Sequence, residues 1–255
     1  MRGRVLSPLI QLCVMQKINI RGVEFSNVDM REALEFAKKN ILHKNRAAIY
    51  TLNAEITQTC IDDGSFDIIN SADMIIPDGA GVVLASRILK TPLKEKVAGI
   101  DLAYKIIDYL DETGGTLFLL GARREAVEKA ADNLRAKHKS LKVFYHDGYF
   151  APEENKKITD KINESKADAV FVGLGAPKNQ EKWIYENKTE LNKGILIGLG
   201  GTIDNIAGYN KRAPDIMIKL NLEWLYRLLK NPRRIKRFMK LPKFIFGTYC
   251  NKNKK

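Results

Sequence analysis

The sequence has few cysteines, few histidines and no long apolar run. Its 255 residues include only three cysteines and three histidines. The cysteines (Cys13, Cys60 and Cys250) lie far apart, which excludes a disulfide framework and a CxxC pair, and no Cys/His spacing fits a structural zinc site. No segment approaches the roughly 18–20 unbroken apolar residues that a membrane-spanning helix needs. We therefore expect a cytoplasmic protein without a spanning helix.

Prolines are also scarce, at 8, and the 18 glycines are about the average share, whereas 45% of the residues are hydrophobic. This composition excludes a mostly disordered chain, because enough apolar surface is present to build a core. The length corresponds to one large domain or two small ones. No internal repeat or low-complexity linker interrupts the chain.

The net charge of +13 is concentrated at the C-terminus. Residues 211–255 carry 14 Lys and Arg but only two acidic residues, a net charge of +12, which leaves +1 for the first 210 residues. A near-neutral body with a basic appendage points to an anionic partner, either nucleic acid or acidic lipid. We accordingly divide the chain into a near-neutral body, residues 15–210, and a basic C-terminal appendage, residues 211–255.

Residues 1–14 differ from the regular pattern that follows them. Their short apolar stretch is interrupted by Pro8 and Gln11, and no small-residue cleavage site follows it. We expect a non-native or disordered extension, with Met15 as the true start, rather than a secretion signal.

Short apolar runs alternate with amphipathic segments from Lys17 onwards. A strand pair is expected around Gly22, and Asp29 with Glu32 forms a capping box that predicts a helix over 29–40. Further strands are expected at 47–52, 74–76, 116–120, 142–145, 169–174 and 194–199, and helices from near 54 and 81 and over 125–138, 153–164 and 179–187. This alternation predicts an α/β fold, a Rossmann-like parallel sheet with helices on both faces.

The basic appendage has a helical pattern. Residues 214–230 predict one amphipathic helix, and Asn231-Pro232 begins a second, with Asn as N-cap and Pro in the first turn. We expect Leu241-Pro242 to end this helix. Basic and apolar side chains alternate over 224–246, a pattern suited to adsorption on an anionic membrane surface.

Glycines follow three of the expected strands. They are Gly121, then Gly173 and Gly175, then Gly198, Gly200 and Gly201. Ligands of open α/β sheets bind beyond the carboxyl ends of the strands, where glycine lets the backbone approach a phosphate. Three such loops on one sheet edge favour a nucleotide-type ligand. Neither a complete GxGxxG nor a GxxxxGK[ST] motif is present, which argues against NAD-type and Walker-type sites.

Asp78 follows the expected strand 74–76 and stands between Pro77 and Gly79. Its carboxylate can face the cleft as a general base or can cap the next helix, and the residues alone leave both interpretations open. The chain has no D-x-D pair, which metal-dependent sugar-nucleotide transferases commonly use. We therefore expect no metal cofactor, and we expect cationic side chains of the appendage to neutralise any diphosphate.

Together these segments resemble the WecG/TagA/CpsF family of glycosyltransferases, in order from about residue 17 to 245. The segments that carry the resemblance are 51–54, 73–79, 97–102, 118–121, 146–150, 173–181, 198–201, 213–214, 222–228 and 232–234. The resemblance implies an inverting transfer of N-acetylmannosamine from its UDP derivative to undecaprenyl-diphosphate-linked N-acetylglucosamine, in wall teichoic acid or related polysaccharide synthesis. It also implies a peripheral location on the inner face of the plasma membrane, where the lipid acceptor lies.

The resemblance further implies roles for single residues. Asp78 is the expected base that deprotonates the acceptor hydroxyl, and Thr51 and Asn53 are expected to line the pocket beside it. Gln180 is expected to contact the sugar or the acceptor. The glycine loops near 121, 173–175 and 198–201 are expected to hold UDP, which is a substrate and not a cofactor.

Cationic side chains complete the implied site. Arg227, Arg234 and Arg237 match arginines that fold over the cleft and stabilise the diphosphate in family terms. Lys96 stands where the family usually has Arg, and it keeps the charge but loses bidentate recognition.

Two alternatives remain open from the sequence. One keeps the family and changes the donor to UDP-glucose, UDP-N-acetylglucosamine or UDP-N-acetylmannosaminuronate, because epimers differ by a few hydrogen bonds. The other is a nucleic-acid-binding module, which leaves Pro77-Asp78-Gly79 and the glycine loops unexplained; we expect no nucleic acid as partner. Apolar helices of the body suit either a homo-oligomer face or a monomer core.

Overall fold

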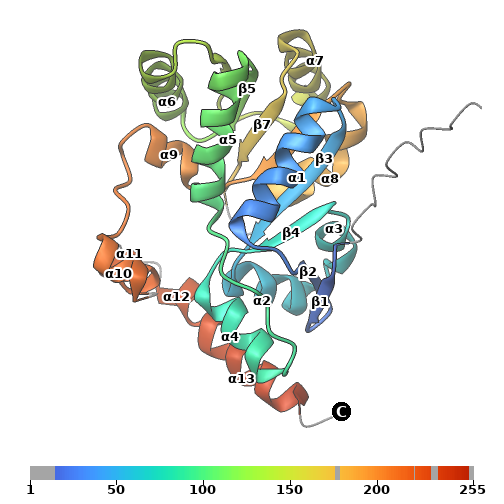
Figure 1. Cartoon of the computed structure of the whole chain (residues 1–255), viewed down its shortest axis with the longest axis vertical. Helices are drawn as coiled ribbons and strands as arrows, with labels where there is room; N and C mark the ends of the chain where they lie inside the picture. Colours follow the sequence, from blue (N-terminus) through green and yellow to red (C-terminus); the bar gives the residue numbers. More distant parts are fainter. Residues whose placement is uncertain (1–14, 176–178, 221, 231–234, 253–255) are drawn as a thin grey trace, which may run out of the picture.

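The computed structural model describes residues 15–175, 179–220, 222–230 and 235–252. A six-stranded parallel sheet lies between two layers of helices, and a small hairpin and the C-terminal helices lie toward one end of the molecule (Figure 1). The extension expected at 1–14 lies outside the described residues.

The sheet has the strand order β4-β3-β8-β7-β5-β6, and every neighbouring pair is parallel. Its strands are β3 (Arg46–Leu52), β4 (Met74–Pro77), β5 (Thr116–Gly121), β6 (Lys142–His146), β7 (Ala169–Gly173) and β8 (Gly194–Gly198). The central strands β5, β7 and β8 are buried at every position, which explains their nearly continuous apolar sequences. The predicted α/β, Rossmann-like class is confirmed.

Helices cover both faces of the sheet. On one face lie α1 (Met30–Leu42), α5 (Gly99–Thr113), α6 (Arg124–Lys137) and α9 (Thr202–Ile206). The other face is covered by α2 (Ala54–Asp63), α3 (Phe66–Asn70), α4 (Ala80–Ile88), α7 (Asn155–Ser165), α8 (Asn179–Asn187) and the hairpin of β1 (Lys17–Ile20) and β2 (Val23–Ser26). Two clusters of buried side chains, one per face, form the core.

The local signals explain several element boundaries. Helix α1 begins at the predicted capping box, in which Asp29 Oδ1 accepts from the Glu32 N–H (2.8 Å) and Glu32 Oε2 accepts from the Asp29 N–H (2.9 Å). Helix α7 begins two residues later than predicted, because residues 152–154 form a 3₁₀ turn. Helix α5 is absent from the sequence prediction. It starts after Ala98 with no side-chain cap, although its buried residues recur at helical spacing.

In its described residues the appendage contains the helices α10 (Asp215–Lys219), α11 (Glu223–Lys230), α12 (Ile235–Phe238) and α13 (Lys240–Lys252). Two predictions about this part of the chain are wrong. The predicted single helix over 214–230 is interrupted, because α10 ends at Lys219 and neither Leu220 nor Leu222 is helical. Pro242 does not end a helix; it lies in the first turn of α13, where proline's missing N–H has no helical acceptor to lose. The start expected at 231–232 lies outside the described residues.

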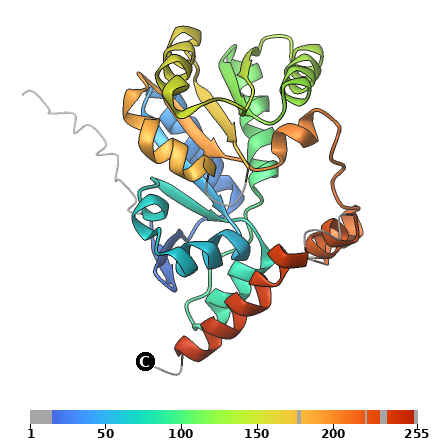
Figure 2. The ribbon, with the colours of Figure 1, turned by 180° about the vertical axis from the view of Figure 1, so that it is seen from behind.

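Helix α13 packs against α2 and α4, beside them in both views (Figures 1 and 2). Phe244 is fully buried there, whereas Phe246, two residues on, is 72% exposed. Polar contacts fix the same interface: the Lys240 ammonium donates to Thr59 Oγ1 (2.5 Å), and Lys243 pairs with Asp62 (2.7 Å). Phe244, which was expected to belong to the lipid-facing segment, is thus part of the core and is not available to contact lipid.

Candidate active site

The loops that follow the strands gather along one edge of the sheet, because all six strands are parallel. The three glycine loops follow β5, β7 and β8, which are consecutive in the sheet order. The exits of β3 and β4, which carry Asn53 and Asp78, lie beside that of β8. The sequence prediction that these motifs share one edge is confirmed, and we take this carboxyl edge as the candidate active site.

Asp78 lies directly after β4 and is half-buried. Its backbone N–H donates to the Leu52 carbonyl of β3 (2.9 Å), so the exits of the two strands are held together. Gly79, at φ 150°, begins the turn into α4, and a Cβ there would lie 3.5 Å from the Cβ of Asn53. Gly79 is the N-cap residue of α4, one position after Asp78. The carboxylate is therefore placed at the sheet edge by backbone contacts.

Asn53 and Thr51 are both engaged in the fold. Asn53 caps α2, with its Oδ1 accepting from the Ile56 N–H (3.0 Å), which leaves its amide Nδ2 for a ligand. Thr51 is 5% exposed, and its hydroxyl donates to the Gly198 carbonyl of β8 (2.7 Å). A Cβ at Gly99 would lie 2.8 Å from the Thr51 methyl, so Thr51 also sets how closely α5 approaches the sheet. Thr51 therefore has a structural role at the site: it joins β3 to β8 and packs against the start of α5.

Gln180 and Glu181 lie in the first turn of α8 and are both buried. Gln180 Nε2 donates to Glu181 Oε1 (2.9 Å). The Tyr50 hydroxyl donates to the Glu181 backbone carbonyl (3.0 Å), and burial raises the pKa of Tyr50 far above its ordinary value, which keeps it a neutral donor. Gln180 packs on Gly198, where a Cβ would lie 3.3 Å from its Nε2. The structure thus brings Thr51, Gly198 and Gln180 together.

The glycines of the candidate site fall into two groups. A Cβ at Gly121 would overlap the Gly173 carbonyl, and a Cβ at Gly173 would lie 3.0 Å from the Gly200 carbonyl. These two glycines are required by the close approach of neighbouring strand exits. Gly175 and Gly200 are exposed, with nothing within 4 Å of a Cβ, and Gly201 is exposed as well. The second group is the one whose backbone is open to a ligand.

Alanine substitutions separate the two groups. Gly121→Ala is expected to lower the free energy of unfolding by at least about 2 kcal/mol, because the clash is with backbone and φ is +134°. Gly200→Ala is expected to leave stability within about 0.5 kcal/mol and to weaken UDP binding. Urea unfolding and UDP calorimetry measure the two effects. A stable Gly121→Ala variant, or unchanged UDP binding by Gly200→Ala, would contradict this division.

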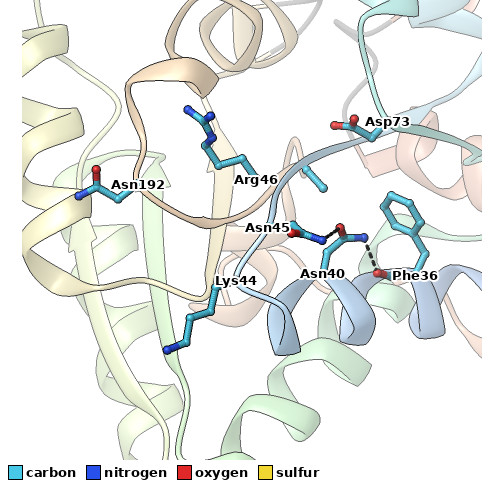
Figure 3. Close-up of a pocket in the computed structure, with 8 residues that line it drawn as sticks. Phe36, Asn40, Lys44, Asn45, Arg46, Asp73 and Asn192 are labelled. Carbon is cyan, nitrogen blue, oxygen red and sulfur yellow. Dashed lines mark hydrogen bonds between the residues drawn. The ribbon is translucent and has the colours of Figure 1, made fainter. Parts of the chain in front are cut away.

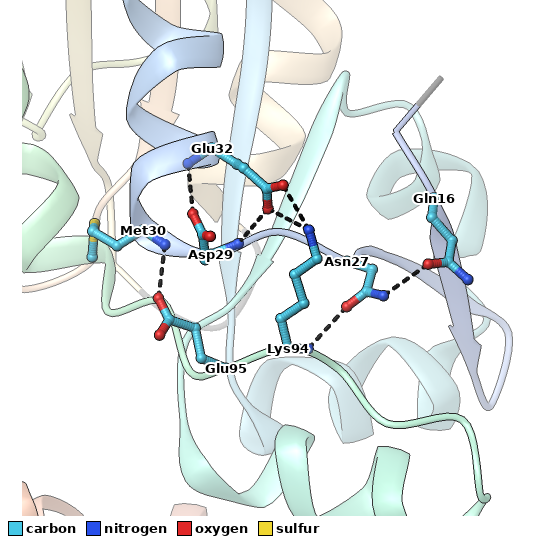
Figure 4. Close-up of polar contacts among 7 residues, drawn as sticks. All are labelled: Gln16, Asn27, Asp29, Met30, Glu32, Lys94 and Glu95. Atoms are coloured by element: carbon cyan, nitrogen blue, oxygen red, sulfur yellow. Dashed lines mark hydrogen bonds and ion pairs between the residues drawn. The ribbon is translucent and has the colours of Figure 1, made fainter. Parts of the chain in front are cut away.

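Lys96 lies in the loop between α4 and α5. The two residues before it in this loop, Lys94 and Glu95, form polar contacts with the start of α1 (Figure 4). The Lys94 ammonium contacts both carboxylate oxygens of Glu32 (2.6 and 2.7 Å), and Glu95 Oε1 accepts from the Met30 N–H (2.7 Å). The hydrogen bond from Lys94 lowers the pKa of the Glu32 carboxyl below its ordinary value, so this contact stays charged at neutral pH.

The same loop is anchored to the candidate site. The Val97 N–H donates to the Pro77 carbonyl (3.1 Å), one residue before Asp78. Lys96 is half-buried at this point. This hydrogen bond places the backbone of Lys96 and Val97 beside the exit of β4, where Asp78 follows Pro77.

The three arginines that were predicted to stabilise the diphosphate belong to the appendage. Arg234 lies outside the described residues. Arg227 belongs to α11 and Arg237 to α12, and only their backbone is described. In both views α10 and α11 stand to one side of the sheet (Figures 1 and 2). The predicted contribution of these arginines to the site stays a prediction.

One arginine that the sequence did not single out joins the appendage to the body. Arg212 forms a bidentate ion pair with Asp101, with N–O distances of 2.5 and 2.7 Å. Asp101 lies in the first turn of α5, two residues after Gly99. Asp101 belongs to a motif that carries the family resemblance, but its partner lies 111 residues away, and no local signal connects the two.

A cavity of about 580 Å³ opens at the opposite, amino edge of the sheet (Figure 3). It is lined by Asn40, Lys44, Arg46, Asp73 and Asn192, among others. Asp73 is engaged by the Ala48 N–H (2.7 Å) and by Lys188 (2.5 Å). This cavity lies away from Asp78 and the glycine loops, since it sits where the strands begin.

Across residues 15–175, 179–220, 222–230 and 235–252, no three His, Cys, Asp or Glu side chains gather as a metal site would require. In the same ranges no helix has the length and apolar character needed to cross a bilayer.

Comparison with known proteins places these observations in a family. The Glycosyl transferase WecG/TagA/CpsF family matches residues 18–255. A relative from Bacillus subtilis (strain 168), named N-acetylglucosaminyldiphosphoundecaprenol N-acetyl-beta-D-mannosaminyltransferase, is 34% identical over 245 residues, 94% of each chain. A relative of the same name from Staphylococcus aureus (strain MW2) is 36% identical over 233 residues, 90% of this chain and 91% of its own.

Proposed function

This chain belongs to the WecG/TagA/CpsF family of glycosyl transferases, and we propose that it moves N-acetylmannosamine from UDP-N-acetylmannosamine to N-acetylglucosaminyldiphosphoundecaprenol. The reaction inverts the anomeric carbon and serves teichoic acid or related cell-surface polysaccharide synthesis. Support comes from the shared name of the two relatives and from matches along at least 90% of the chain. The observation that carries the proposal is the place of Asp78: half-buried, at a strand exit, on the same edge as the glycine loops.

In the proposed mechanism Asp78 is the general base. Its carboxylate takes the proton from the acceptor hydroxyl as the oxygen attacks the anomeric carbon of the donor. The bond from that carbon to the UDP oxygen breaks on the opposite face, so the configuration inverts. Asn53 Nδ2, at the neighbouring exit of β3, is available to hold the acceptor or the sugar.

The leaving UDP gains negative charge as the bond breaks. We propose that the open glycines Gly175, Gly200 and Gly201 let the backbone approach the diphosphate. Lys96, Arg227, Arg234 and Arg237 are proposed to neutralise it, which makes a metal ion unnecessary. Lysine at 96 supplies charge without the bidentate geometry of arginine.

The enzyme is proposed to act at the membrane surface through its appendage. The acceptor named for the relatives is a lipid, and the appendage combines a net charge of +12 with exposed apolar side chains. Those with the largest exposed fractions are Ile216, Leu220, Leu229, Met239 and Phe246. Phe244 is excluded from this surface because it is buried. Basic residues near anionic lipid each contribute on the order of 1 kcal/mol, so several suffice for peripheral binding.

The test is acceptor-dependent UDP release in the presence of EDTA. With UDP-N-acetylmannosamine and a lipid-diphosphate N-acetylglucosamine acceptor, we expect turnover that EDTA does not reduce. Turnover that requires a divalent cation would overturn the metal-free mechanism. Turnover only with another UDP-sugar would overturn the donor and retain the mechanism.

A further inference from the structure

Glu181 is a fully buried carboxylate with no role in the mechanism above. It is 0% exposed, and Gln180, beside it, is 2% exposed. Carboxylates are almost never buried to this extent without a specific partner, because the charged form loses its hydration. Here one partner is the Gln180 side chain, whose Nε2 lies 2.9 Å from Glu181 Oε1.

This contact determines which way the Gln180 carboxamide faces. A carboxamide has one NH₂ donor and one oxygen acceptor, and the two orientations differ by a half-turn. A carboxylate only accepts, so it attracts the NH₂ group and repels the oxygen. A neutral or apolar side chain at 181 would lose this preference, since it could accept and donate equally or do neither.

The selected orientation leaves Gln180 Oε1 as an acceptor without a hydrogen bond in the described chain. An unsatisfied buried acceptor is rare and destabilises the folded protein, so it calls for a reason. The side chain packs on Gly198, whose carbonyl accepts the Thr51 hydroxyl. The acceptor therefore belongs to the carboxyl edge, next to the residues proposed to hold substrate.

We propose that Glu181 is a positioning residue that holds the Gln180 carboxamide so that Oε1 accepts a hydrogen bond from a hydroxyl or amide N–H of a substrate sugar. The inference rests on the proposed function, because it requires a sugar at this edge. Glu181 acts through Gln180 and does not touch the substrate. The Tyr50 hydrogen bond to the Glu181 backbone fixes the turn that carries both side chains.

The experiment is a double-mutant cycle with steady-state kinetics. Glu181→Met removes the acceptor and Gln180→Ala removes the positioned amide, and each is expected to lower kcat/KM about tenfold, the loss typical of one hydrogen bond. The double variant is expected to be no less active than Gln180→Ala alone, because Glu181 has nothing left to position. Glu181→Gln, which permits both orientations, is expected to lose only about two- to threefold.

A matched control removes a carboxylate elsewhere on the same helix. Glu186 is exposed, and its Oε1 lies 3.6 Å from the Nζ of Lys182. We expect Glu186→Gln to keep the wild-type kcat/KM. A rise in KM for the UDP-sugar assigns the hydrogen bond to the donor sugar, and a rise in KM for the lipid acceptor assigns it to the acceptor sugar. Either result supports the positioning role.

Three results would overturn it: wild-type kcat/KM in Glu181→Met, losses that multiply in the double variant, or a loss that the fraction of unfolded protein in thermal melts fully explains. If Glu181→Met does not fold, the same cycle is read with the nearly isosteric Glu181→Gln. Failure of the proposed function is distinct, since a wild-type enzyme inactive with every UDP-sugar overturns both proposals. An active wild type with independent losses overturns the role of Glu181 alone.

Discussion

Replacing Asp78 with Asn is expected to lower kcat by about 10²–10⁴-fold, the range observed when a general base is removed. Asparagine has nearly the same shape but cannot take a proton from the acceptor hydroxyl at neutral pH. The backbone hydrogen bond from residue 78 to Leu52 is retained, so the melting temperature is expected to stay close to wild type. Acceptor-dependent UDP release and thermal melts measure the two quantities.

The pH dependence of kcat/KM is a second, independent test of Asp78 as the general base. A general base must be deprotonated to act, so wild-type kcat/KM is expected to rise from acidic pH to a plateau. In Asp78→Asn this rising limb is expected to disappear. Asp108→Asn, an exposed carboxylate on α5, serves as the control and is expected to retain both rate and profile. If Asp78→Asn kept the rate and the limb, the base would have to be another group.

The arrangement of the carboxyl edge was predictable because it follows from strand direction. Once the apolar runs are interpreted as parallel strands, the residues after each run must share one edge, and Asp78 and the glycine loops do. The division among the glycines was not predictable. Gly121 is required because β5 pairs with β7 and brings it against Gly173, and strand order is a tertiary property.

Other parts of the site depend on contacts between residues distant in sequence. Thr51 was predicted to line the pocket, yet its hydroxyl is bonded to Gly198, 147 residues away. Arg212 gave no local signal, because its role comes from Asp101 across the fold. The apolar residues at 244–246 suited a lipid surface equally well throughout, and only the packing of α13 on α2 and α4 divides them.

Removing four basic residues from the appendage is expected to weaken binding to anionic vesicles about 10³-fold. The residues, replaced by Gln, are Arg233, Arg234, Lys236 and Arg237. Each Lys or Arg near an anionic surface contributes on the order of 1 kcal/mol, so about 4 kcal/mol is lost, and each 1.4 kcal/mol is a factor of about ten. Co-sedimentation with vesicles of phosphatidylglycerol and phosphatidylcholine at about 0.1 M salt measures the partition coefficient.

The control separates local from total charge. Four exposed lysines of the body (Lys105, Lys137, Lys139 and Lys161) are replaced by Gln, which removes the same charge from a different surface. We expect this variant to bind anionic vesicles nearly as well as wild type, because residues more than a Debye length of about 10 Å from the lipid are screened. Equal weakening by both variants would mean that net charge alone attracts the protein. Unchanged binding by the appendage variant would leave the exposed apolar side chains of α10–α13 as the membrane contact, with Phe246 and Met239 as the next residues to replace.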